Sequence, residues 1–203
     1  MAEVNRFPGY STLAKRDTPS WNDASRKVVD KRLNDPPQRR FFTVEEWPTL
    51  LAICDRIMPQ PARGEAKVPI ANFIDQKMAE NQTDGMQQAG EPDMQSMWRF
   101  GLAATDEEAR LRFNNPFPDL PAGRQDDILH MIQEGNVRAP GWSRLPAKPW
   151  FKSRVLHDVV TMYYAHPQGW DEIGFGGPAS PRGYVRMGFD RHDPWDAVER
   201  KHA

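Results

Sequence analysis

One stretch near the C-terminus limits what this chain can fold into. Residues 170–184 have the sequence WDEIGFGGPASPRGY, and six of these fifteen residues are glycine or proline. Glycine permits left-handed backbone conformations, and proline fixes φ and removes an amide donor, so we expect no regular helix here. Its large apolar side chains nevertheless need a surface to cover them: Trp170, Ile173, Phe175 and Tyr184. That surface is either the chain's own helices or another protein.

The composition predicts a modest core with much irregular chain around it. Only 38% of the 203 residues are hydrophobic, and 19 are proline, about twice the average usage. This length favours one domain with room for long arms. The net charge of -1 gives no electrostatic reason to expect a nucleic acid or an anionic membrane as a partner.

The single cysteine, Cys54, excludes an internal disulfide, a cysteine-rich metal site and an iron–sulfur cluster. No stretch approaches the roughly 20 apolar residues that span a bilayer. The N-terminal residues lack the apolar core of a signal peptide, and Arg39-Arg40 is followed by Glu45-Glu46 where a twin-arginine signal needs an apolar segment. We therefore expect a cytoplasmic protein, or a periplasmic one if a signal was removed or is supplied by another subunit.

Apolar periodicity predicts an all-α fold, an irregular bundle of about five or six helices with long non-helical N- and C-terminal arms. A capping box at Thr43 and Glu46 opens the first helix, and Cys54 lies on its apolar face. Further helices are expected after Pro69, after Asp93, after a second capping box at Thr105 and Glu108, around 128–132 with a stop at Gly135, and over 150–163.

The chain accordingly divides into three predicted parts. Residues 1–40 form an extended polar arm in which 26–33 has the pattern of a short charged helix, residues 41–166 form the helical domain, and residues 167–203 form an irregular segment rich in aromatic residues, glycine and proline. The arm is either flexible or laid on a partner, because four of its side chains are unusual ones to leave in water: Phe7, Tyr10, Leu13 and Trp21.

No pattern of catalytic or ligand-binding residues stands out in the sequence. The five histidines lack a metal-ligand spacing, and Gly174–Gly177 lacks the strand–turn–helix context of a phosphate-binding loop. The adjacent acids Glu107-Glu108 and Asp126-Asp127 point about 100° apart on a helix, so we interpret them as solvated helix faces. We expect no catalytic, cofactor-binding or metal-binding residue in this chain.

The C-terminal segment instead has the composition of an interface, where tryptophan, tyrosine and arginine are over-represented. We predict that it docks on a partner. The predicted partner-binding residues are Trp170, Phe175, Arg182, Tyr184 and Trp195. The alternative for each aromatic side chain is packing on the chain's own bundle.

Several short segments carry a resemblance to a known family: 42–59 (FTVEEWPTLLAICDRIMP), 68–75, which ends in Phe-Ile-Asp, 117–120 (FPDL) with Gln125 and Leu129, 163–167 (YYAHP), and 170–178 with 182–184. In this order and spacing they resemble the gluconate 2-dehydrogenase subunit 3 family over about residues 41–190. The resemblance implies a non-catalytic small subunit that assists the folding, stability or export of a large flavin-dependent dehydrogenase of the glucose–methanol–choline type.

In that family the large subunit oxidises a sugar, sugar acid or glycoside, and electrons often pass on to a cytochrome c. The resemblance therefore implies no cofactor in this chain and FAD in the partner. Many members carry a twin-arginine signal, which this sequence lacks, so an export role is disfavoured. Two alternatives remain open: a self-associating helical protein whose tail packs on a copy of itself, and a stand-alone enzyme using His157, His166 or Asp171.

Overall fold

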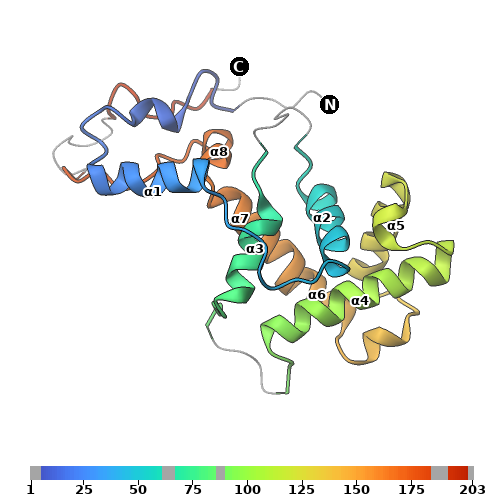
Figure 1. The fold of residues 1–203 in the computed structure, drawn as a ribbon. Coiled ribbons are helices and arrows are strands. Elements are labelled where there is room, and N and C mark those ends of the chain that lie inside the picture. The colour runs from blue at the N-terminus through green and yellow to red at the C-terminus, as the bar shows by residue number, and fades with distance from the viewer. Residues whose placement is uncertain (1–5, 61–66, 86–89, 184–191, 201–203) are drawn as a thin grey trace. The chain divides into compact units, whose positions relative to one another are not determined.

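The protein is all-helical in the computed structural model, which describes residues 6–60, 67–85, 90–183 and 192–200 (Figure 1). No strand occurs in these ranges, so the predicted fold class is confirmed. The α-helices are α1 (Asp23–Asn34), α2 (Glu46–Ile57), α3 (Ile70–Ala79), α4 (Met94–Phe113), α5 (Ala122–Glu134), α6 (Ala147–Trp150), α7 (His157–Tyr164) and α8 (Pro167–Trp170). A π-helical segment, Phe151–Leu156, joins α6 to α7, and 3-10 helices lie at Thr12–Lys15, Phe117–Asp119, Pro140–Ser143 and Asp171–Ile173. Within the described ranges, none of the helices is both long and apolar enough to cross a membrane.

Residue contacts divide the chain into two compact units. The helical unit is Pro37–Met162 and contains α2 to α6 and most of α7. The terminal unit combines Met1–Pro36 with Tyr163–Ala203 and contains α1 and α8. Both arms predicted from the sequence therefore belong mainly to one unit.

Helix α2 begins as predicted. Thr43 donates its amide to Glu46 Oε2 at 2.9 Å, and the Glu46 amide donates to Thr43 Oγ1 at 3.2 Å, so the capping box is complete. The buried face of α2 centres on Leu50, Ile53 and Cys54, all at most 5% exposed. The packing role predicted for Cys54 is confirmed, and burial raises the pKa of its thiol.

The second predicted capping box is wrong. Asp93 caps α4 as expected by accepting the Ser96 amide at 2.8 Å, but α4 then runs without a break to Phe113. Thr105 lies inside this helix and donates its hydroxyl to the Gly101 carbonyl one turn back, at 2.7 Å. The same Ser/Thr-x-x-Glu spacing that opens a helix also occurs within one, and only the surrounding backbone distinguishes the two cases.

Glu108 is also not the solvated residue that we expected, because it is 0% exposed. Its carboxylate accepts the amides of Arg138 and Ala139 at 2.8 and 2.7 Å, and Arg112 donates to it at 2.5 Å. The loop after α5 thus packs over this face of α4. A buried carboxylate with three donors stabilises that loop instead of facing water.

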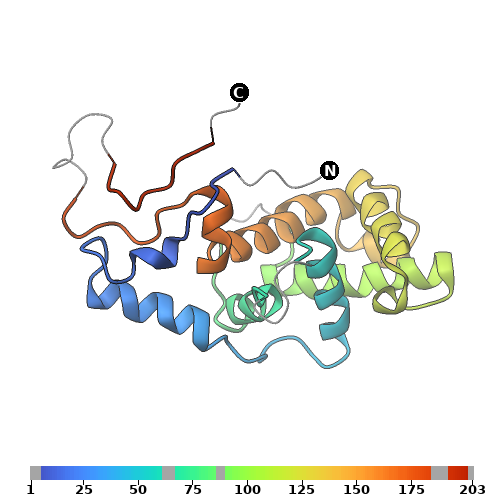
Figure 2. The same cartoon turned by 90° about the horizontal axis from the view of Figure 1, so that it is seen from above.

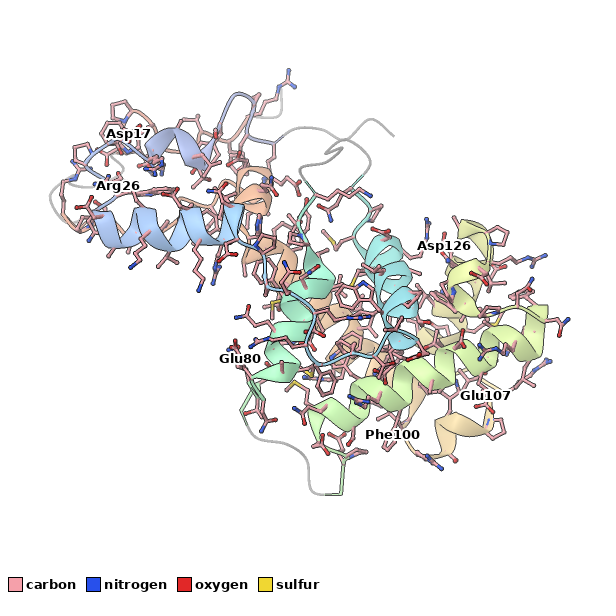
Figure 3. All side chains as sticks on the ribbon, viewed as in Figure 1. Asp17, Arg26, Glu80, Phe100, Glu107 and Asp126 are labelled. Carbon is pink, nitrogen blue, oxygen red and sulfur yellow. The ribbon has the colours of Figure 1, made fainter. Side chains whose placement is uncertain are left out.

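In the helical unit, where Figure 3 labels Phe100 and Glu107 on α4, two tryptophans are among the largest fully buried side chains. Trp98 of α4 and Trp150 of α6 are 0% and 1% exposed, and their rings meet edge to face with centroids 6.0 Å apart. The Trp150 ring lies directly on α4, since a Cβ added at Gly101 would stand 2.0 Å from Trp150 Cε2. Only glycine at position 101 permits this close approach.

Two buried carboxylates complete the core of the helical unit. Asp75 of α3 accepts the backbone amides of Arg40, Phe41 and Phe42 at 2.6, 3.0 and 2.8 Å, which holds the chain as it enters α2. Asp158 of α7 accepts the Trp98 indole N–H at 2.8 Å and is bound by a lysine of α3. Hydrogen bonds to each charge offset the cost of removing it from water.

The predicted N-terminal arm is not an extended segment throughout. Residues 23–34 form α1, a longer helix than the short one considered over 26–33, and the Asn22 side chain caps it by accepting the Ser25 amide at 2.9 Å. Val29 of α1 is 1% exposed, because this helix lies beside the C-terminal segment (Figure 2). Burial of its apolar face stabilises α1, although most of the other residues in this helix are charged or polar.

Candidate functional site

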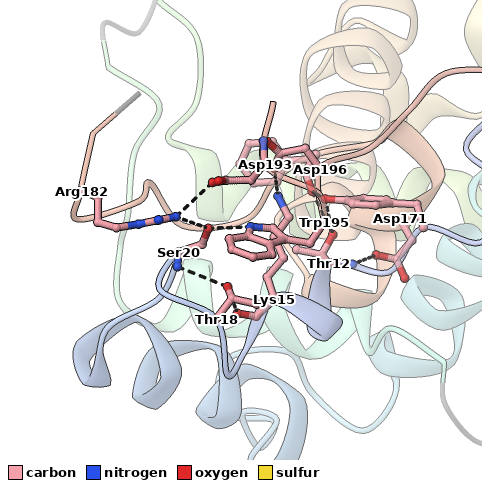
Figure 4. A network of polar contacts seen from close by, with 11 residues as sticks. Thr12, Lys15, Thr18, Ser20, Asp171, Arg182, Asp193, Trp195 and Asp196 are labelled. Atoms are coloured by element: carbon pink, nitrogen blue, oxygen red, sulfur yellow. Dashed lines mark hydrogen bonds and ion pairs between the residues drawn. The ribbon is translucent and has the colours of Figure 1, made fainter. Parts of the chain in front are cut away.

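The C-terminal segment predicted to bind a partner packs against the N-terminal segment of its own chain (Figure 4). Trp170 is 6% exposed and joins Trp21 and Val29 in a small apolar core. Leu13 and Leu33 pack against this core. The Trp170 indole N–H donates to the Tyr164 carbonyl at 2.9 Å, so the whole side chain is satisfied within the terminal unit.

Polar contacts join the two segments around this core. Thr12 donates its amide to Asp171 Oδ1 at 2.7 Å and its hydroxyl to the Phe175 carbonyl at 2.9 Å. Lys15 Nζ lies 2.6 Å from Asp196 Oδ1, and the exposed fractions of these two side chains are only 5% and 18%. The N-terminal segment therefore supplies hydrogen bonds to carboxylates of the irregular tail and to the Phe175 carbonyl, which lies outside any helix or strand that would satisfy it.

Both members of the Lys15–Asp196 pair are charged at neutral pH. Burial by itself would raise the pKa of Asp196, but the hydrogen bonds from Lys15 and from the Asp193 amide outweigh it and hold the pKa below its usual value. Burial would likewise lower the pKa of Lys15, and the opposing attraction of Asp196 and Tyr10 raises it. The pair thus acts as a buried ionic link between the two ends of the chain.

A second polar cluster is centred on Ser20, which is 6% exposed. Its hydroxyl oxygen accepts the Trp195 indole N–H at 2.9 Å and Nη2 of Arg182 at 3.4 Å (Figure 4). Arg182 also donates to Asp193 at 3.0 Å, and its guanidinium lies 5.8 Å from the centre of the Trp195 ring. Two of the predicted partner-binding residues are therefore brought together by one serine of the N-terminal segment.

Phe175 is a predicted partner-binding residue whose side chain reaches into solvent. Its side chain is 47% exposed, and the neighbouring Ile173 is 46% exposed. The Phe175 ring rests edge to face on Trp170 with centroids 5.4 Å apart. Tyr184, the fifth predicted residue, lies outside the described residues. Contact of these residues with another protein stays a prediction.

Sequence reasoning missed the residues that hold the tail. Thr12, Lys15 and Ser20 are common polar residues without a recognisable motif, and each is less than 7% exposed. The one available signal was the aromatic content of residues 7–21, which indicated a surface that needed covering. It did not indicate that the C-terminal segment of the same chain packs on these residues.

One group of potential metal ligands occurs within the described ranges. Asp84, His157 and Asp158 have ligand atoms within 4.8 Å of one another. However, Lys77 Nζ lies 2.6 Å from Asp84 and 2.8 Å from Asp158, and Arg154 lies 2.7 Å from Asp84. Two cations already balance the two carboxylates, so we interpret the group as a structural ion-pair network.

The glycine-rich stretch Gly174–Gly177 also has a structural explanation. Gly174 ends a 3-10 helix in the left-handed conformation with φ 64°, and Gly177 has φ 74°. A Cβ at Gly174 would stand 2.6 Å from the ring of Phe7, so both backbone conformation and space favour glycine. In the described stretch up to Gly183 it opens no helix, which agrees with our interpretation of backbone turns.

A comparison with protein-family models gives one match over residues 44–177, to the model described as gluconate 2-dehydrogenase subunit 3. The match includes α2 to α8 and ends within the glycine-rich stretch, so α1 and most of the C-terminal segment lie outside it. Neither a curated protein nor a solved structure matches the chain.

Proposed function

Because this chain belongs to the gluconate 2-dehydrogenase subunit 3 family, we propose that it is the non-catalytic small subunit of an FAD-dependent dehydrogenase of the glucose–methanol–choline type. Its role is to stabilise a large catalytic subunit that binds the flavin and oxidises a sugar, sugar acid or glycoside. Electrons then pass to an acceptor such as a cytochrome c. The observation that carries the proposal is the family match over residues 44–177. A cytoplasmic location is part of the proposal, and cell fractionation tests it.

We place the contact with the catalytic subunit on the terminal unit. The exposed ring of Phe175 and the adjacent Ile173 support this placement, because a pair of large apolar side chains in solvent is typical of a binding surface. Arg182 and the half-buried Trp195, which meet at Ser20, belong to the same unit. Trp170, being buried beneath Phe175, contributes by holding that ring in position.

The first test is a mild affinity purification of the chain from its native cell, followed by an absorbance spectrum of the eluate. We expect a larger chain to co-elute with flavin absorbance bands, and the complex to oxidise a sugar or glycoside in a dye-linked assay. A colourless single chain, or a homo-oligomer without a second protein, would overturn the proposed function.

The placement of the contact has its own test. Phe175→Ala should weaken association by about 2 kcal/mol, roughly 30-fold, if this ring is an interface anchor. Val44→Ala is the matched control, since Val44 is 65% exposed and belongs to the helical unit. Equal binding of both variants would show that the contact lies elsewhere, while the flavin-bearing complex would still support the function.

A further inference from the structure

The helical unit contains a pocket that the proposed function does not use. Its volume is about 460 Å³, within the range of pockets that hold small organic ligands. The floor is apolar and largely buried, with Met97, Leu145 and Trp150 at 9%, 2% and 1% exposure. Met94, Pro146 and Pro149 extend this apolar lining toward the rim. A thioether and an aromatic ring together accommodate flat apolar groups of varied shape.

The rim of the pocket is polar, and two of its charged residues, Asp84 and Arg154, are paired with each other. Asp84 binds Lys77 at 2.6 Å and Arg154 at 2.7 Å. Burial alone would raise the pKa of Asp84, but these two cations outweigh it and hold the pKa below its usual value. Asp84 and Arg154 therefore present little net charge to a ligand. Thr83 and Ser153 add hydroxyl groups to the same rim.

Arg144 lines the same rim, with no ion pair to another described residue, although Glu91 also lines the rim. The Arg144 guanidinium instead lies 5.7 Å from the centre of the Phe100 ring of α4, which holds it beside the pocket. An arginine has a planar set of donors that matches carboxylate and sulfonate groups, and within the described ranges that set has no anionic partner.

We propose that this pocket binds a small amphipathic anion. The apolar body of the ligand lies against Met97 and Trp150, and its carboxylate or sulfonate accepts hydrogen bonds from Arg144. The hydroxyls of Thr83 and Ser153 supply further hydrogen bonds at the rim. This ligand class matches two properties of the pocket, an apolar floor and an arginine that has no ion-pair partner among the described residues.

A pair of fluorescent probes of similar shape and different charge tests the proposal on the full chain. The anion is 8-anilinonaphthalene-1-sulfonate, and the neutral analogue is N-phenyl-1-naphthylamine. We expect the anion to bind at one saturable site, and Arg144→Met to weaken this binding about tenfold or more, because a charge-assisted hydrogen bond is lost. The neutral probe should lose no more than about twofold, since it makes no such bond.

Two further variants make the result decisive. Arg138→Met is the matched control, an exposed arginine of the same unit that does not line the pocket, and it should leave both probes unaffected. Ser153→Trp places a large ring at the rim and should abolish binding of both probes. Absence of a saturable site, or an anion affinity that is the same in Arg144→Met, Ser153→Trp and the unchanged chain, would overturn the proposal. Circular dichroism verifies that each variant is folded.

Discussion

Replacing Asp196 by asparagine tests whether the two ends of the chain are held together by a buried charge pair. The substitution preserves the shape of the side chain and an acceptor for the Asp193 amide, but it removes the negative charge that faces Lys15 at 2.6 Å. Lys15 then remains buried, with 5% of its side chain exposed, and without its counter-ion. Only the terminal unit should respond, because both partners belong to it.

The magnitude follows from the burial of the pair. Removing one partner of a fully buried ion pair costs about 3–5 kcal/mol, and the 18% exposure of Asp196 places this pair at or below the lower end, at about 2–3 kcal/mol. Opening of the terminal unit should therefore be roughly 30- to 150-fold more frequent. Native-state hydrogen exchange measures this directly at the amides of Thr12 and Arg16, which donate to Asp171 and to the Leu13 carbonyl.

The chain contains a matched control for this experiment. Arg6 and Glu199 also join the two ends at 2.6 Å, but their side chains are 64% and 49% exposed. Glu199→Gln should leave the exchange rates unchanged, because water screens an exposed pair. The double variant Lys15→Met with Asp196→Asn should recover most of the loss, since no unpaired charge stays buried. Unchanged exchange in Asp196→Asn, or an equal effect of Glu199→Gln, would refute the role of burial.

Two further predictions concern the helical unit. Gly101→Ala should lower the free energy of unfolding of this unit by about 3 kcal/mol in a urea titration, because the new methyl would stand 2.0 Å from the Trp150 ring. Gly123→Ala in α5 is the control. It has no atom within 4 Å of the new methyl and should be neutral or slightly stabilising in the same titration. The second concerns pH. Burial alone would raise the pKa of Glu108, but hydrogen bonds from the amides of Arg138 and Ala139 and from Arg112 outweigh burial and lower this pKa. Ionised Glu108 therefore stabilises the folded chain fully above the unfolded-state pKa of about 4.3. This stabilisation is lost as the pH falls below that value. Glu108→Gln should accordingly be less stable than the unchanged chain at about pH 7, and it should lose less stability on acidification to about pH 3. Parallel profiles of the free energy of unfolding against pH for the two chains would contradict this.

Signals between close neighbours in the sequence were sufficient for three helix ends. The Thr43–Glu46 box, the Asp93 cap and the stop at Gly135 each depend on groups only a few residues apart, and the structure has all three. Such local hydrogen bonds form in the same way wherever the helix lies in the fold. The order of the motifs was likewise sufficient to identify the family, which the match over residues 44–177 confirms.

Local signals were insufficient wherever a distant segment supplied the environment. Thr105 and Glu108 match a helix start, but the chain around residue 138 covers Glu108 and the helix continues through both. Asp196 and Lys15 are 181 residues apart and share no pattern from which their contact could be predicted.

Composition alone predicts that the aromatic tail needs a covering surface, because its apolar side chains are costly to leave in water. Which surface covers the tail depends on the folded chain: the N-terminal segment covers Trp170, and about half of Phe175 stays in solvent. Sequence alone cannot give this answer, because burial depends on which segments come together in space. Composition states how much apolar surface needs a partner, and contacts between residues far apart in the chain select which partner it has.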